Sequence, residues 1–228
     1  MDTNFSCRDF KGAAKARKYY LPEFEFQEIE IIDFCKANPL NVNREVVERK
    51  IHLLNKYYST RVPVEVLIDK ILSIEDFDLQ LQSGNISLVN KIADCDKDYF
   101  SFATKYCAMH QPEKYPIYDS LVWKFLSNLK AQRYFEGYPY ISNFSFFGPL
   151  NNGRSFHYAE YVNIYNEFLK RSGAQSKLNY REVDFAIWGL IKIQLTYGHN
   201  ESAFSKIWPT AAANLISNIL WQFIRSLF

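Results

Sequence analysis

Apolar residues recur at helical spacing along most of this 228-residue chain, and this pattern is the feature that most restricts its fold. Segment 43–58, NREVVERKIHLLNKYY, places Val46, Val47, Ile51, Leu54 and Tyr58 near helical spacing. Similar segments follow, separated by short connections that carry proline, glycine or polar residues. The sequence therefore predicts an all-α fold.

The same spacing and its end signals give the predicted helices. Pro63 is expected in the first turn of its helix, Asn179 as an N-cap, and Gly173 at a helix end. Segment 137–155, GYPYISNFSFFGPLNNGRS, is predicted to be an irregular aromatic-rich loop or a short hairpin. The predicted helices span 22–37, 43–58, 62–72, 85–94, a stretch around Lys105, a stretch from Ser120 toward Lys130, 156–173, 179–195 and 210–228.

The distribution of charge and the helical pattern predict two regions in the chain. Residues 1–20 form a basic N-terminal arm, and residues 21–228 form one helical domain, either compact or split into two lobes with a central cleft. The last predicted helix, 210–228, is expected to dock onto the domain. A membrane-surface or partner-binding helix is the alternative for this segment.

Composition excludes several classes of protein. No apolar run approaches the ~20 residues of a membrane span, and the basic N-terminus lacks the apolar block of a secretory signal. A cytoplasmic, intracellular location is expected, nucleoid-associated in a bacterium. The net charge of +2 means that DNA binding would need a local basic face. Neither the four histidines nor the four cysteines have metal-ligand spacing, so no metal is expected; the cysteines are Cys7, Cys35, Cys95 and Cys107.

Two opposite charges stand among apolar residues in the stretch SFATKYCAMHQPEKYPIYDSLVW, 101–123. Lys105 is expected in the opening of one helix, where the electropositive helix end and apolar neighbours favour the neutral, nucleophilic amine. Asp119 is expected at the mouth of the next helix, where it would remain ionised and could stabilise a developing cation. The structural alternatives are a surface lysine that covers apolar side chains and an aspartate that only caps its helix.

These residues resemble the helix-hairpin-helix DNA glycosylase superfamily, and its 8-oxoguanine glycosylase branch in particular. The resemblance rests on FATK with Lys105, YPIYD with Asp119, and the following SLVW. The segment ERKIHLLNKYYSTR, 48–61, is similar in position to an early helix of those enzymes that approaches the lesion pocket. The resemblance implies an all-α, helix-hairpin-helix glycosylase-like fold.

The resemblance also implies an activity. A base is flipped out of double-stranded DNA, Lys105 attacks the sugar to form a Schiff base, and Asp119 stabilises the sugar cation, with or without a lyase step. The implied partner is a duplex with a damaged or modified base; the protein is expected to be a monomer without a cofactor. Candidate DNA contacts are Arg49, Lys50, Arg61, Lys114, and Ser101 and Ala103, which stand where the family has hairpin glycines. Candidate pocket or wedge residues are Tyr57, Tyr58, Tyr118 and Trp123.

Other classes remain open. The stretch GPLNNGRS, 148–155, has P-loop spacing but carries Arg154 in place of the lysine, so an Asn-Gly turn is the favoured interpretation. A non-catalytic helical module that binds DNA or protein is the main alternative to an enzyme. Such a module would use the basic faces of 44–61 and the N-terminal arm, and it would leave Lys105 protonated.

Overall fold

A computed structural model gives the fold and describes residues 10–14, 18, 22–95, 99–131, 135–136, 158–175 and 177–197. Within these ranges the regular structure is helical and no β-strand occurs, so the prediction of an all-α fold is confirmed for this part of the chain. None of the helices described there is long and apolar enough to cross a membrane. The predicted irregular segment 137–155 and the predicted helix 210–228 lie outside the described residues.

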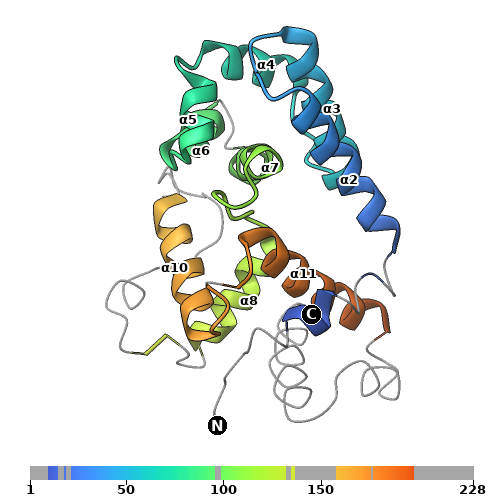
Figure 1. The fold of residues 1–228 in the computed structure, drawn as a ribbon, viewed down its shortest axis with the longest axis vertical. Helices are drawn as coiled ribbons and strands as arrows, with labels where there is room; N and C mark the ends of the chain where they lie inside the picture. Colours follow the sequence, from blue (N-terminus) through green and yellow to red (C-terminus); the bar gives the residue numbers. More distant parts are fainter. Residues whose placement is uncertain are drawn as a thin grey trace. The chain divides into compact units, whose positions relative to one another are not determined.

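The described helices are α2 (Pro22–Ala37), α3 (Arg44–Tyr58), α4 (Val64–Ser73), α5 (Phe77–Ser83), α6 (Ser87–Ala93), α7 (Phe100–His110), α8 (Ser120–Ala131), α10 (Tyr158–Arg171) and α11 (Tyr180–Tyr197). Short connections join α2 to α8 in chain order, as Figure 1 shows, whereas α10 begins well after α8 ends. Eight of these helices lie where the sequence predicts a helix. The short helix α5 is not among the predicted ones.

The chain divides into two compact units, and each is built from segments far apart in sequence. Unit 1 contains Met1–Pro22, Asp119–Phe147 and Ile164–Phe228, and unit 2 contains Glu23–Tyr118 and Gly148–Asn163. Consequently, α3 to α7 belong wholly to unit 2, and α8 and α11 belong wholly to unit 1.

Unit 2 is organised around α7, which is buried almost all round. Helix α3 packs against α4 and α7, while α6 packs against α4, α5 and α7. Figure 1 shows α7 in end view among these helices. A helix that is apolar on all sides belongs in the interior, and every residue of 102–109 is buried.

Local capping explains several helix ends. The side chain of Asn43 accepts a hydrogen bond from the N–H of Val46 and so caps α3. Asn179 and Glu182 bond each other's backbone N–H groups at 2.9 and 2.8 Å, which forms a capping box at α11. Gly173, with φ of 63°, follows α10. The predicted N-cap at Asn179 and the predicted helix end at Gly173 are confirmed. Pro63, by contrast, lies just before α4 and not in its first turn.

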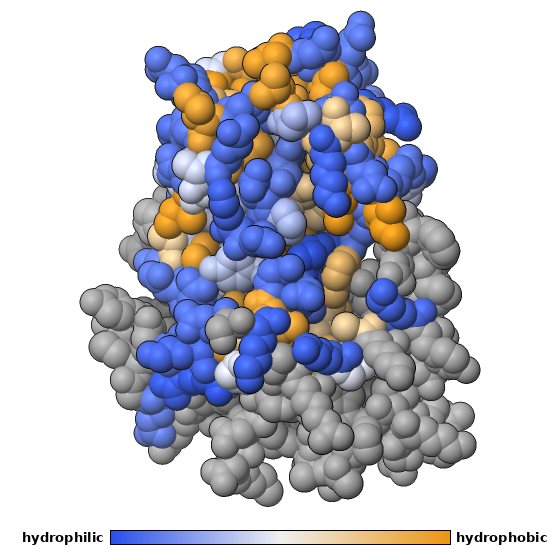
Figure 2. All heavy atoms as spheres, in the orientation of Figure 1, coloured by the Kyte–Doolittle hydropathy of each residue, from blue (hydrophilic) through white to orange (hydrophobic). Residues whose placement is uncertain are grey.

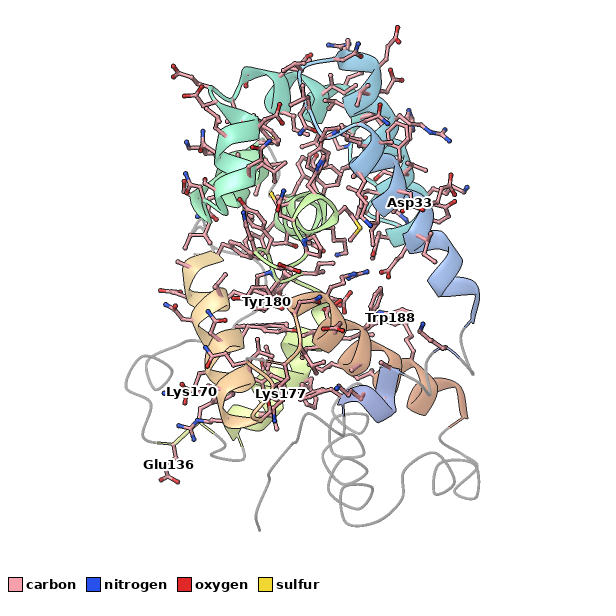
Figure 3. The ribbon with its side chains drawn as sticks, viewed as in Figure 1. Asp33, Glu136, Lys170, Lys177, Tyr180 and Trp188 are labelled. Carbon is pink, nitrogen blue, oxygen red and sulfur yellow. The ribbon has the colours of Figure 1, made fainter. Side chains whose placement is uncertain are left out.

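Unit 1 has an aromatic interior. Phe168 meets Phe10 and Phe125 edge-on, with ring centroids 5.7 and 5.8 Å apart. Residues 10–14 are helical, so this part of the predicted basic arm packs within unit 1. Helix α8 also packs against α11, on which Figure 3 labels Tyr180 and Trp188.

Candidate active site

Lys105 lies in the middle of the central helix of unit 2. It is the sixth of the 11 residues of α7, because this helix begins at Phe100. The structure thus places it in the second turn, beyond the opening in which the sequence pattern locates it. The field of a helix end falls off within the first turn, so the electropositive end of α7 acts only weakly on this amine.

The Nζ atom of Lys105 is held by neighbouring oxygen atoms, and the residue is only 4% exposed. Nζ donates to the Oγ of Ser101 at 2.5 Å, and it lies 3.4 Å from the carbonyl oxygen of Ser101 and 3.3 Å from that of Tyr118. It also lies 5.7 Å from the ring centre of Tyr58, within the range of a cation–π contact. This amine therefore has a defined position inside unit 2.

Helix α7 also holds the peptide groups of Tyr118, the residue before Asp119. The N–H of Tyr118 donates to the Oγ1 of Thr104 at 3.1 Å, and its carbonyl accepts from the Oγ of Ser101 at 3.2 Å. Lys105 adds its own bond to the same carbonyl. Thr104 and Lys105 lie three and four residues after Ser101, so all three side chains share one face of α7.

Two tyrosines of α10 hold the residues just upstream. The hydroxyl of Tyr158 donates to the carbonyl of Pro116 at 2.8 Å, and the hydroxyl of Tyr161 donates to that of Ile117 at 2.7 Å. All three carbonyls from Pro116 to Tyr118 therefore have protein donors, and residues 115–118 are buried. The chain that leads to Asp119 is fixed within unit 2.

Asp119 is the first residue of its segment of unit 1 and the N-cap of α8. Its Oδ1 accepts from the N–H of Leu121 at 2.8 Å, and its carbonyl accepts from the N–H of Trp123 at 2.8 Å. Capping is therefore an actual role of this carboxylate. Its catalytic role stays a prediction.

The predicted pocket or wedge residues have different surroundings. Tyr118 and Trp123 are buried, and Tyr118 packs edge-on against Phe100 and Tyr161 at centroid distances of 5.1 and 5.5 Å. Tyr57 and Tyr58 are half-buried. The hydroxyl of Tyr58 donates to Glu28, and that of Tyr57 donates to Glu30. Stacking of any of these rings on a base stays a prediction.

The predicted DNA contacts divide by exposure. Arg49, Arg61 and Lys114 are exposed, and Ser101 is partly exposed. Ala103 is fully buried inside α7, and Lys50 is 1% exposed. Lys50 lies on the buried face of α3 next to Ile51. A phosphate contact by any of these six residues stays a prediction.

The exposed cations of α3 are mostly offset by carboxylates. Arg44 pairs with Glu65 and, at 2.8 Å, with Asp69. Arg49 and Lys56 each lie 3.9 Å from Glu30. Figure 2 shows hydrophilic residues over much of unit 2 with hydrophobic ones among them. Paired charges lower the local positive potential, so this face is a weaker phosphate-binding surface than its cation count indicates.

A buried polar cluster in unit 2 is absent from the sequence predictions. Asn41 accepts bonds at Oδ1 from the Nζ of Lys50 at 2.8 Å and the hydroxyl of Tyr106 at 2.6 Å. Its side-chain and backbone N–H groups donate to the carboxylate of Asp78. A lysine next to Ile51 on the apolar face of α3 was the available signal for this cluster, but its partners come from a loop and two other helices.

Burial perturbs the ionisation of this cluster. It lowers the pKa of Lys50 from 10.5 to about 8, an effect that the nearby Cys35 and Asp78 partly oppose. It raises the pKa of the Cys35 thiol to about 11. Burial and the charge of Lys50 lower the pKa of His110 to about 3. Burial thus disfavours the charged forms of Lys50, Cys35 and His110.

Some predictions lie outside the described residues, including the P-loop-like stretch 148–155 and the cysteine at position 7. Within the residues that the structure describes, no group of three or more His, Cys, Asp or Glu side chains could hold a metal ion.

Two comparisons find similarity to known proteins. A protein family described as "HI_0787_N: N-terminal domain" matches residues 11–114. A Haemophilus influenzae protein named "Uncharacterized protein" is 29% identical over 136 residues, which cover 45% of this chain and 68% of that relative. No solved structure matches the chain. The family match includes all of α2 to α7 and ends between Lys105 and Asp119, so the similarity extends over the helices that surround Lys105.

Proposed function

We propose that the protein is a DNA glycosylase that excises a damaged or modified base through a Schiff base on Lys105. The observation that supports this most is the fixed, buried amine of Lys105, bonded to the carbonyl of the residue that precedes Asp119. The helix, six-residue connection and helix formed by α6, residues 94–99 and α7 is also compatible with a helix-hairpin-helix arrangement. We therefore propose this fold for the region around Lys105.

The chemistry requires a neutral amine. The Nζ lone pair of Lys105 forms a bond to C1′ of the flipped nucleotide while the bond between C1′ and the base breaks, and the departing base takes up a proton. Opening of the sugar ring then gives an iminium between Nζ and C1′. Asp119 would stabilise the cationic character of the sugar during the first step.

Three hydrogen-bond acceptors near Nζ suit the three N–H groups of an ammonium. We propose that Lys105 rests as an ammonium and loses this proton before it attacks, so that the rate of attack rises with pH until the proton is gone. Displacement of water by a flipped base would favour the neutral form further, because desolvation disfavours charge.

Borohydride trapping tests the proposal. Hydride reduces the iminium to a stable amine, so a Schiff-base enzyme becomes covalently attached to its DNA. The substrates are duplexes that carry oxidised, alkylated, deaminated or hypermodified bases, with undamaged duplex as the reference. We expect wild-type protein to be trapped on at least one modified duplex and Lys105→Gln on none.

Lys91→Gln is the matched control, because Lys91 is exposed on α6 and bonds only Gln80 among the described residues. It should be trapped like the wild type. If the wild type forms no adduct and releases no base from any duplex, the glycosylase proposal is wrong and the non-catalytic binding module is favoured. Measurement of duplex binding by the same preparation would then test that module directly.

A further inference from the structure

We propose that Ser101 is a positioning residue for Lys105, whose hydroxyl orients the amine and sets the pH at which it reacts. This inference rests on the proposed function of Lys105. Ser101 lies one helical turn before Lys105 on α7, and its Oγ is 2.5 Å from Nζ. The resemblance to glycosylases assigns Ser101 to the DNA backbone, whereas the structure gives its side chain a partner inside the site.

The direction of the hydrogen bonds defines what Ser101 does. Its hydroxyl proton is donated to the carbonyl of Tyr118 at 3.2 Å, which leaves an oxygen lone pair for the N–H of Lys105. Ser101 therefore acts as an acceptor toward the amine. Tyr118 is also bonded to α7 through its N–H, which donates to the Oγ1 of Thr104 at 3.1 Å, so the acceptor of the Ser101 hydroxyl has a fixed place.

Two consequences follow for the reaction. An acceptor binds an ammonium more strongly than a neutral amine, so Ser101 favours the protonated lysine and delays its activation as the pH rises. The same bond holds Nζ in one place, and loss of orientation slows a reaction between fixed groups. Removal of the hydroxyl should thus ease deprotonation and reduce the maximal rate.

Neighbouring hydroxyl groups provide controls. The Oγ1 of Thr104 donates to the carbonyl of Ser101 at 3.0 Å and accepts from the N–H of Tyr118, so it supports the same connection through backbone groups. Thr104→Val should lower stability without moving the pH profile. Ser83, whose hydroxyl bonds the carbonyl of Gln80 on α5, is the control for a serine lost from a helix of the same unit.

The experiment is the single-turnover rate of borohydride trapping from about pH 6 to about pH 10, on the duplex that traps the wild type best. Ser101→Ala should lower the maximal rate about ten-fold and move the half-maximal pH about one unit downward. Ser101→Thr keeps the hydroxyl and should restore both values toward wild type. Alanine is well tolerated in a helix, so the variant should fold, and a thermal melt verifies this.

The outcomes separate the two proposals. If the wild type is trapped and Ser101→Ala keeps the wild-type pH profile, the role of Ser101 is wrong and the glycosylase proposal stands. A lower rate without a pH shift, equal in Ser101→Ala and Thr104→Val, would indicate a structural role only and would also overturn the inference. If the wild type is trapped on no duplex, both proposals fail.

Discussion

Replacement of Lys50 by methionine should change how the free energy of unfolding depends on pH in the alkaline range. Lys50 is buried, and its Nζ donates to the carbonyl of Leu40 at 3.0 Å and to Asn41 at 2.8 Å. Burial lowers its pKa from 10.5 to about 8. Each pH unit of such a change is worth about 1.4 kcal/mol, so the full effect is about 3 kcal/mol.

The direction of this pH effect on stability depends on whether the folded or the unfolded chain holds the proton of Lys50. Between about pH 8 and pH 10.5, the unfolded chain keeps a proton on Lys50 that the folded chain has lost. The contribution of Lys50 to the free energy of unfolding therefore rises with pH across this window. Below about pH 8 both states are protonated, and the contribution stays at its least favourable value.

Other groups act in the opposite direction. Burial raises the pKa of Cys35 to about 11 and that of Tyr106 well above its usual value, so both ionise first in the unfolded chain. They lower stability as the pH rises. The informative quantity is therefore the difference in free energy of unfolding between Lys50→Met and wild type, in which most of these effects cancel.

Urea unfolding at several pH values from about 7 to about 10 measures this difference. At the lowest pH, removal of the buried charge raises the stability of the variant, and loss of the hydrogen bonds of Lys50 lowers it. As the pH rises, its stability relative to wild type should fall by most of about 3 kcal/mol. Lys56→Met, on the same helix but exposed, controls for loss of a lysine charge. A Lys50→Met difference that is constant over this range would mean that the pKa of Lys50 is not lowered in the folded protein.

Three further predictions concern single positions. Asp119→Asn should keep the α8 cap and change the free energy of unfolding by a few tenths of a kcal/mol, while single-turnover excision slows by about 10²-fold; unchanged excision would remove the residue from the mechanism. Lys105→Gln should abolish base release and change urea-unfolding stability by less than about 1.5 kcal/mol, whereas a much larger loss would indicate a packing role. Gly84→Ala should cost about 1 kcal/mol in the same assay, because Gly84 has φ of 76° and closes α5; a gain in stability would contradict this.

Most helices were predictable because a 3.6-residue apolar period needs no tertiary information. The exception, α5, shows the limit of that signal. Its sequence FDLQLQS alternates apolar and polar residues, and Leu79 is exposed. Seven residues are too few to distinguish a helix from other structures by period. The left-handed Gly84 that ends this helix was the stronger local sign.

The candidate site was predictable only in part. The spacing of Ser101 and Lys105 places them on one helix face, and the position of Asp119 before a helix predicts a cap. The bonds of α7 to Tyr118 depend on how the connection folds back, which no local pattern specifies. The burial of Lys50 was not predictable from local sequence either. Its partner Asn41 lies in a loop and also bonds Tyr106, 65 residues away in sequence.

Identification of the residue that carries the trapped DNA shows whether Lys105 is the nucleophile. Wild-type protein is reduced with borohydride on its best duplex, digested with nuclease and protease, and mapped by mass spectrometry. We expect the deoxyribose remnant to be attached to the Nζ of Lys105 in the peptide that contains FATK, and we expect Lys91→Gln to give the same peptide. An adduct on the N-terminal amine or on any other lysine, with Lys105 unmodified, would contradict this expectation.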